Sequence, residues 1–303
     1  MFKKILLLSL ILSSSTLHAK DNIVIYHAYG NTHQIVIQGR MVKKKPFKVA
    51  NKEDGWFKNL WRKIREIEGN ELKNQTIYAS ITHEKFKTKG DDEGYFEFHI
   101  TTQKALKTGY AKVYIHIEKN ANIHESNVTI IDSQPLIGII SDFDDTIIVS
   151  DVTHKIQFAQ NTLFKNYKQR KVVPTMLERF QKILAQNPKD TPSTLFILTG
   201  SPQQLFIPIE NFLTYHHFPK RTLILKKIHG DHKDPISDQF AYKTQKIEQL
   251  IKLYPNIKWI MFGDSGQKDP QIYKAIQEKH PNSTINYYIR DVESGEIKEY
   301  NKL

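Results

Sequence analysis

Acidic and hydroxyl side chains follow several short apolar runs in the second half of this sequence. In chain order these residues are Asp142, Asp144, Thr146, Thr199, Gly200, Ser201, Asp264 and Asp269. Taken singly, each group has an ordinary structural explanation. An Asp-rich stretch often forms the turn after a strand, and Ser201 before Pro202 fits a simple helix N-cap. Their recurrence at one strand end after another is what indicates a shared site.

The residue types in this set suit the handling of a phosphate group. Carboxylate oxygens, such as those of Asp264 and Asp269 on a Gly-containing turn, are the ligands that a hard cation such as Mg²⁺ prefers. A hydroxyl and a small residue at a helix N-terminus, as in Thr199–Gly200–Ser201, can hold a phosphate oxygen. Lys243 could add positive charge, although its position alone says little, because the chain has 44 lysines and arginines.

The elements that must position these groups are those of a parallel sheet. In residues 133–303, short apolar runs alternate with helical stretches, which predicts a parallel sheet with helices on both faces. The predicted strands are 135–141, 194–198, 222–225, 258–262 and 285–289. The predicted helices are about 157–168, 175–186, 202–215, 240–253 and 270–279. Ligands of such sheets sit at the carboxyl ends of the strands, so we expect the site there.

The first half of the chain has a different periodicity. Over residues 20–132, apolar and polar residues alternate in short runs separated by turns, which predicts a β-sandwich-like accessory domain. The predicted strands are 33–42, 75–82, 94–100 and 111–118. Residues 56–67 instead predict a basic amphipathic helix that contains Trp56 and Trp61. This helix could lie on an anionic membrane, but we favour the interpretation that it covers one end of the sandwich, because apolar stripes usually face cores.

With Lys243 included, the order and spacing of the candidate residues resemble the haloacid dehalogenase superfamily of phosphohydrolases. SDFDDTI at 141–147, TGSP at 199–202 and GDSGQKDPQIY at 263–273 are similar to the catalytic domain of the actin-patch-protein family of Mg²⁺-dependent phosphatidate phosphatases. The resemblance covers about residues 135–295. GRMV at 39–42 and DDEGYF at 91–96 resemble that family's β-rich N-terminal domain. The implied fold is an α/β, Rossmann-like three-layer domain with little or no cap, preceded by the β-sandwich-like domain.

The resemblance also implies a role for each residue. Asp142 would attack phosphorus and form an aspartyl-phosphate. Asp144 would protonate the leaving alkoxide and then deprotonate the attacking water. Mg²⁺ would be bound by Asp142, the backbone carbonyl of Asp144, Asp264 and, directly or through water, Asp269. The residues that would contact the phosphoryl group are Thr199, Lys243, Thr146, Gly200 and Ser201.

Some positions depart from the family pattern. Ile148 stands where a basic residue is common, Gln203 where an aromatic residue is common and Tyr242 where a histidine is common. No catalytic group is lost, but the contacts to the rest of the substrate differ. The connections 151–173 and 228–239 are too short for a large cap domain. A site with so little cover suits a substrate that is large or held in a membrane.

Composition restricts the remaining possibilities. Because the chain has no cysteine, a disulfide framework, a thiolate zinc site and a cysteine nucleophile are excluded. No apolar run reaches about 18 residues, which excludes a multi-pass membrane protein. The net charge of +12 suits an anionic partner such as a membrane surface, but it also fits a general bias toward lysine. Nothing in the sequence matches a nucleic-acid recognition motif, so we expect no specific nucleic-acid partner.

The first residues have the layout of a secretory signal peptide. Lys3 and Lys4 precede the apolar run 5–12, and Ala19 closes a segment rich in small residues. We therefore expect residues 1–19 to be removed and the protein to be exported, either to the periplasm or out of the cell.

Three functions are compatible with these patterns. We favour an exported Mg²⁺-dependent phosphatase acting on phosphatidic acid or a related lipid phosphate. The alternatives are a phosphatase for soluble or protein-bound phosphate esters and a catalytically idle binding module. The acidic set argues against the idle module.

Overall fold

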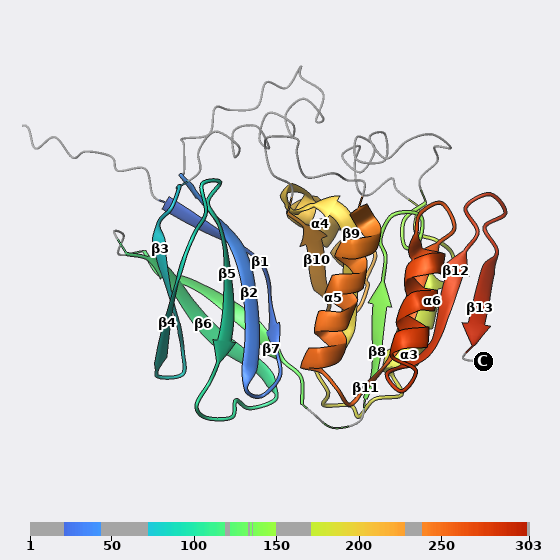
Figure 1. Cartoon of the computed structure of the whole chain (residues 1–303), viewed down its shortest axis with the longest axis horizontal. Coiled ribbons are helices and arrows are strands. Elements are labelled where there is room, and N and C mark those ends of the chain that lie inside the picture. Colours follow the sequence, from blue (N-terminus) through green and yellow to red (C-terminus); the bar gives the residue numbers. More distant parts are fainter. Residues whose placement is uncertain are drawn as a thin grey trace, which may run out of the picture.

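The computed structural model describes residues 21–43, 72–118, 122–132, 134, 136–149, 171–227 and 238–301. Within these residues the chain forms two sheets, one in each half of the sequence (Figure 1). The mixed α/β fold with a β-rich first half is thus confirmed. The predicted signal segment 1–19 and the predicted helices at 56–67 and 157–168 lie outside the described residues. None of the described helices has the length and apolar character needed to cross a membrane.

The first half is a single seven-stranded sheet, not the two packed sheets of the predicted β-sandwich-like domain. Its strands are β1 (Asp21–Gly30), β2 (Gln34–Lys43), β3 (Thr76–Ile81), β4 (Glu84–Lys89), β5 (Tyr95–Thr101), β6 (Gly109–Ile117) and β7 (His124–Ile130). Their order is β4-β3-β6-β7-β1-β2-β5, and only the β1–β7 pair is parallel. β4 and β5 stand at opposite ends of this order, yet a turn of five residues joins them. The sheet therefore curls, and alternate side chains such as Ile77, Ile37 and Val113 fill one apolar core.

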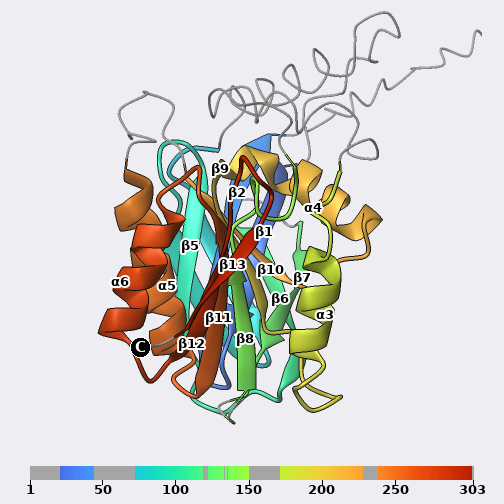
Figure 2. The ribbon, with the colours of Figure 1, turned by 90° about the vertical axis from the view of Figure 1, so that its right-hand side faces the viewer.

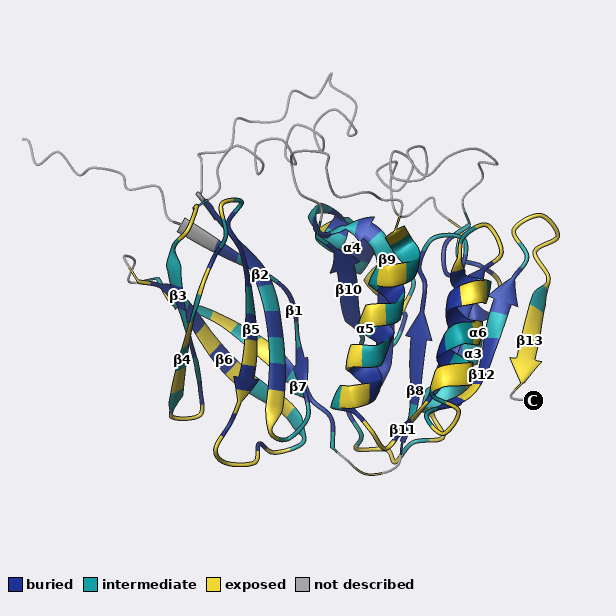
Figure 3. Ribbon diagram, in the orientation of Figure 1, coloured by how far each residue is buried: buried dark blue, intermediate teal, exposed yellow. Residues whose placement is uncertain are grey.

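The second half contains a six-stranded sheet. Its strands are β8 (Leu136–Ser141), β9 (Leu195–Pro202), β10 (Thr222–Lys226), β11 (Ile257–Asp264), β12 (Thr284–Arg290) and β13 (Ile297–Asn301). The order is β10-β9-β8-β11-β12-β13, in which only β13 is antiparallel. Counted within this half, the order is 3-2-1-4-5-6, as in doubly wound sheets. β10 is buried along its whole length, as expected for a strand covered on both faces (Figure 3).

Helices cover both faces of this sheet (Figure 2). The described helices are α3 (Met176–Leu184), α4 (Phe206–Tyr215), which follows the short 3₁₀ turn η2 (Gln203–Leu205), α5 (Gln239–Leu253) and α6 (Asp269–Lys279). Phe180 of α3 and Phe212 of α4 share one apolar cluster with β8, β9 and β11. Ile247 of α5 and Ile272 of α6 share the other with the opposite faces of those strands. The second half is therefore a three-layer α/β/α unit.

The two halves pack directly on one another. Tyr29, in β1, belongs to the same apolar cluster as α5 and α6, and its ring centre lies 5.6 Å from that of Phe196 in β9. Beside it, the Asn31 side-chain amide donates to the carbonyl of Leu253 at 3.0 Å. The β-rich half thus covers part of the α/β half, with β1 and β2 facing it (Figure 1).

Candidate active site

Three of the predicted acidic residues meet at the carboxyl ends of β8 and β11. These strands are neighbours, and Ser141 lies opposite Phe262 in their parallel register. Asp142 follows β8, Asp264 ends β11 and Asp269 begins α6. One carboxylate oxygen from each of these residues lies within 4.8 Å of the others, and all three residues are at most 1% exposed.

Gly263 allows α6 to bring Asp269 this close to the sheet. A β-carbon at position 263 would lie 2.5 Å from the Asp269 Cβ and 2.7 Å from the Tyr273 ring. The Tyr273 hydroxyl donates to the carbonyl of Phe262 at 2.9 Å and so fixes α6 against β11. Glycine is needed here because there is no space for a side chain, and not because the backbone has an unusual φ.

Lys243 joins this cluster from α5. Its ammonium group donates to Asp142 Oδ1 at 2.8 Å and to Asp269 Oδ1 at 2.6 Å, and the lysine is 1% exposed. Burial alone lowers the pKa of Lys243, but the carboxylates of Asp142 and Asp269 outweigh it and the pKa is raised. The buried lysine is therefore positively charged and offsets part of the charge of the carboxylates.

The carboxylates remain in excess of this one cation. Burial, and to a smaller extent the charge of the nearby Asp269, raises the pKa of Asp264 to about 7. Burial also raises the pKa of Asp142 well above its usual range. Within the described part of the chain, Asp142 Oδ2 and Asp264 Oδ2 are buried and have no hydrogen-bond partner. Two such oxygens facing one cluster fit a hard divalent cation, which would be bound by Asp142, Asp264 and Asp269.

Asp144 lies beside the hydroxyl groups that follow β9. Ser201 Oγ donates to Asp144 Oδ2 at 3.0 Å and Thr199 Oγ1 does so at 3.4 Å. The backbone N–H of Ser201 in turn donates to Thr199 Oγ1 at 3.0 Å. The Asp144 carboxylate is not one of the three clustered acids, so a contact to the cation through its backbone carbonyl stays a prediction. Burial raises the pKa of Asp144, against the effect of the Ser201 hydrogen bond, which suits a proton donor.

The last two predicted residues have a smaller part in the geometry. Gly200 lies between Thr199 and Ser201, and a β-carbon there would lie 3.1 Å from the side-chain amide of Gln239. Thr146 is fully buried, and its hydroxyl has no partner among the described residues. The structure therefore places both next to the site without giving either a contact that defines a role.

Sequence reasoning missed Arg290, which lies at the end of β12. Its guanidinium donates to the carbonyl of Asp145 at 2.9 Å. Asp145 has a φ of 56°, an uncommon conformation for a residue other than glycine, and it stands next to Asp144. Arg290 therefore supports the turn that carries Asp144. Its position could have indicated that it belongs to the site, because it is a basic residue directly after the predicted strand 285–289.

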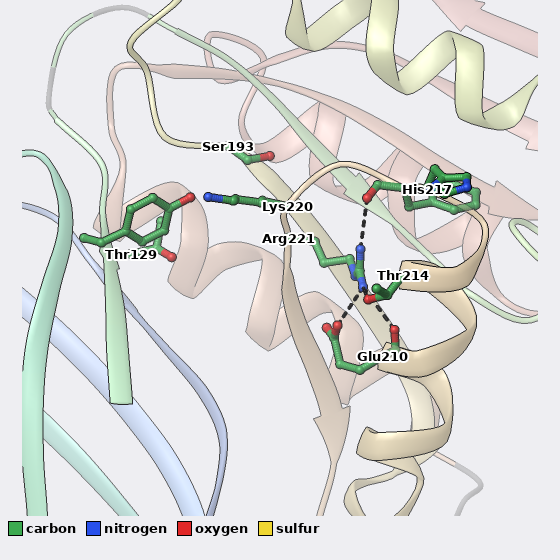
Figure 4. Close-up of a pocket in the computed structure, with 9 residues that line it drawn as sticks. Thr129, Ser193, Glu210, Thr214, His217, Lys220 and Arg221 are labelled. Atoms are coloured by element: carbon green, nitrogen blue, oxygen red, sulfur yellow. Dashed lines mark hydrogen bonds and ion pairs between the residues drawn. The ribbon is translucent and has the colours of Figure 1, made fainter. Parts of the chain in front are cut away.

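A cavity of about 530 Å³ lies near the amino end of β10 (Figure 4). It is away from the acidic cluster, which lies at the carboxyl ends of the strands. Its buried Arg221 guanidinium is bound by Glu210 Oε2 and Thr214 Oγ1, both at 2.7 Å, and by the carbonyl of Phe218. These bonds fix the end of α4 to β10. This cavity therefore lies at the opposite end of the strands from the acidic cluster.

Comparison with known proteins agrees with this assignment. Residues 137–291, just over half of the chain, match the family described as the catalytic domain of phosphatidate phosphatase APP1. All the candidate site residues fall within that range. The matching segment of phosphatidate phosphatase APP1 from Saccharomyces cerevisiae is 28% identical over 155 residues, which is 51% of this chain and 26% of the relative.

A second relative is an uncharacterized protein of Schizosaccharomyces pombe, 25% identical over 178 residues, 58% of this chain and 28% of the relative. The chain thus spans about a quarter of the length of the curated relatives it matches. A carbohydrate acetylesterase from Xanthomonas citri is a weak structural match, with 10% identity, coverage of 89% of this chain and 68% of that one, and a TM-score of 0.30, too low to support an argument. On the family match and the geometry of the acidic cluster, the chain belongs to the family of APP1 phosphatidate phosphatase catalytic domains.

Proposed function

We propose that this protein is a Mg²⁺-dependent phosphatase of the haloacid dehalogenase type that hydrolyses phosphatidic acid or a related lipid phosphate. The observation that carries the proposal is the buried cluster of Asp142, Asp264 and Asp269 with Lys243, inside the segment that matches the family. The name of the yeast relative supports a lipid phosphate as substrate. The net charge of +12 supports peripheral contact with an anionic membrane.

The proposed reaction has two steps, in both of which Asp144 moves the proton. In the first, a carboxylate oxygen of Asp142 forms a bond to phosphorus, the bond from phosphorus to the leaving oxygen breaks, and Asp144 donates its proton to that oxygen. In the second, Asp144 takes a proton from water, the water oxygen attacks phosphorus, and the acyl phosphate bond to Asp142 breaks. Inorganic phosphate and the unmodified enzyme result.

Charge stabilisation supports both steps. The Lys243 ammonium and the hydroxyls of Thr199 and Ser201 surround the place between Asp142 and Asp144 that a phosphoryl group would occupy. Mg²⁺ bound by the three clustered aspartates would neutralise the charge shared by phosphate and carboxylate, so that one anion can approach the other.

The test is phosphate release by the mature chain, Lys20–Leu303. Phosphatidic acid in mixed micelles and 4-nitrophenyl phosphate would be assayed in parallel, each with Mg²⁺ and with a chelator. We expect Mg²⁺-dependent release that strongly favours the lipid. Asp142→Asn should lower turnover by at least about 10³-fold, because the amide is not a nucleophile, whereas Asp190→Asn, at an exposed position, should have no effect.

The outcomes separate the three candidate functions. Release from the soluble ester alone would keep the chemistry and exclude the lipid. Release from neither substrate would favour a binding module. Full activity of Asp142→Asn would contradict the assignment of the nucleophile.

We also propose that the protein is exported, because residues 1–19 have the layout of a signal peptide. N-terminal sequencing of protein recovered outside the cytoplasm of an expressing cell should then begin at Lys20. An intact Met1 on that protein would contradict cleavage at this position.

A further inference from the structure

A second cavity lies between the two halves of the chain, close to the candidate active site. Its volume is about 270 Å³, and its lining includes Gln38, Asp91 and Tyr95 from the β-rich half and Gln203 and Lys227 from the catalytic half. Pockets that bury a whole small ligand measure about 300–1,000 Å³. This cavity is therefore suited to part of a substrate.

Its position relative to the acidic cluster follows from chain connectivity. Gln203 is two residues after Ser201, so their Cα atoms are at most about 7.6 Å apart, and the Ser201 hydroxyl donates to Asp144. Lys227 directly follows β10, and its neighbour Lys226 lies opposite Pro202 in the sheet register. Both lining residues thus lie at the carboxyl ends of β9 and β10, the edge of the sheet where the proposed reaction takes place.

The amides in this cavity can both donate and accept hydrogen bonds. Gln203 is only 4% exposed, and its amide nitrogen donates to Gln38 Oε1 at 3.3 Å, which joins the two halves. Within the described residues its other amide atom, Oε1, has no partner. A buried acceptor without a partner is costly, and the hydroxyl of a bound group would satisfy it.

The side chains that line the cavity carry equal numbers of positive and negative charges. Lys227 binds the carboxylate of Asp91 and lies 5.1 Å from the centre of the Tyr95 ring, and Lys89 and Glu97 contribute one further charge of each sign. A second anionic group would meet two carboxylates here and gain little. Mixed donors and acceptors without net charge instead suit an uncharged group that is rich in oxygen.

We propose that this cavity binds the uncharged, oxygen-bearing part of the phosphate ester that lies next to the scissile phosphate, the glycerol portion of a glycerolipid phosphate. Lys227 and the amide of Gln38 donate to its hydroxyl or ester oxygens, and Gln203 Oε1 accepts from a free hydroxyl. The β-rich half then takes part in substrate recognition. This inference rests on the proposed phosphatase function.

The test compares phosphate esters that differ in the leaving group. Glycerol 1-phosphate carries hydroxyls, phosphatidic acid in mixed micelles carries ester oxygens, and phenyl phosphate carries neither. For Gln38→Ala and Lys227→Ala we expect kcat/KM to fall about five- to tenfold with the glycerol esters, mainly through KM, and to stay within about twofold with phenyl phosphate. A loss confined to phosphatidic acid would assign the contact to its ester oxygens.

Lys220→Ala is the matched control. Its ammonium also crosses between the halves and lies 4.7 Å from the centre of the Tyr110 ring, but at the other end of β10. It should leave all three substrates unchanged. Equal losses on every substrate, or no loss on any, would overturn the subsite while phenyl phosphate hydrolysis still supported the phosphatase. If the parent protein hydrolysed none of the three, the proposed function would fall and this inference with it.

Discussion

At the residue scale, the acidic cluster depends on how closely α6 approaches β11. Gly263 has no side chain, and the Asp269 carboxylate occupies the space that one would need. A methyl group there collides with Asp269 Cβ and with the Tyr273 ring, neither of which is the free end of a flexible chain.

Gly263→Ala should therefore weaken both the fold and the proposed metal site. We expect a loss of about 1–3 kcal/mol in the free energy of unfolding, because the core is overpacked, together with weaker Mg²⁺ activation, since Asp269 must move. Urea denaturation and a Mg²⁺ titration of activity measure the two effects. Gly109→Ala is the control for Mg²⁺ activation, because Gly109 begins β6 in the β-rich half and a β-carbon there would meet no atom within 4 Å. An unchanged Mg²⁺ requirement in Gly263→Ala would contradict this account.

The site residues that could be predicted are those fixed by strand ends. Asp142 and Asp264 end or follow apolar runs, and parallel strands deliver their carboxyl ends to one edge of the sheet. Lys243 could be assigned only through the family resemblance, because a lysine on a helix has many possible orientations. The backbone strain at Asp145 was not predictable, because nothing in DFDDT distinguishes its φ from that of its neighbours.

At the element scale, the strands of the second half that are buried on both faces were the easiest to predict. β8, β10 and β11 are nearly continuous apolar runs, and the predicted strands 135–141, 222–225 and 258–262 are confirmed. β1, β4, β7 and β13 were missed. Two of them, β4 and β13, bury little, and their sequences, EKFKTK and IKEYN, are mostly polar. The predicted helix at 202–215 begins later than expected, at Phe206, because β9 continues to Pro202.

β1 contains a titratable group whose effect on stability can be measured. His27 is 6% exposed. Burial, and to a smaller extent the positive charge of Lys246, lowers its pKa to about 3. In the unfolded chain the histidine titrates near 6.5. Between about pH 3 and 6.5 the histidine is protonated in the unfolded chain but neutral in the folded protein. The stability that the neutral His27 contributes is therefore complete above about pH 6.5 and is lost as the pH falls.

The slope of this loss is about 1.4 kcal/mol per pH unit for one proton. His27→Gln should flatten the dependence of the urea-unfolding free energy on pH between about 6 and 4, relative to the parent. His83→Gln, at an exposed position in the turn before β4, should leave that dependence unchanged. A slope in His27→Gln equal to that of the parent would show that His27 is protonated in the folded protein.

At the scale of the whole molecule, the two halves are joined by side chains that reach from one half into the other. Tyr29 of β1 lies in the apolar cluster of the catalytic half, and Gln38 and Asp91 contact Gln203 and Lys227 near the active site. The change of periodicity near residue 133 predicts two units, and the described strands of one sheet lie before this point and those of the other after it. The interface between the two units was not predictable, because β1, the strand that carries Tyr29, is absent from the predicted strands.

This sharing predicts that the two halves unfold together. Calorimetry should give one transition whose calorimetric and van't Hoff enthalpies agree. Tyr29→Ala should lower the free energy of unfolding by about 3 kcal/mol, because it opens a cavity against Phe196. Tyr114→Ala, at an exposed position of β6, should have little effect. Two separate transitions in the parent protein would mean that the contacts between the halves contribute little to stability, and the β-rich half would then be a poor candidate for a fixed wall of the substrate site.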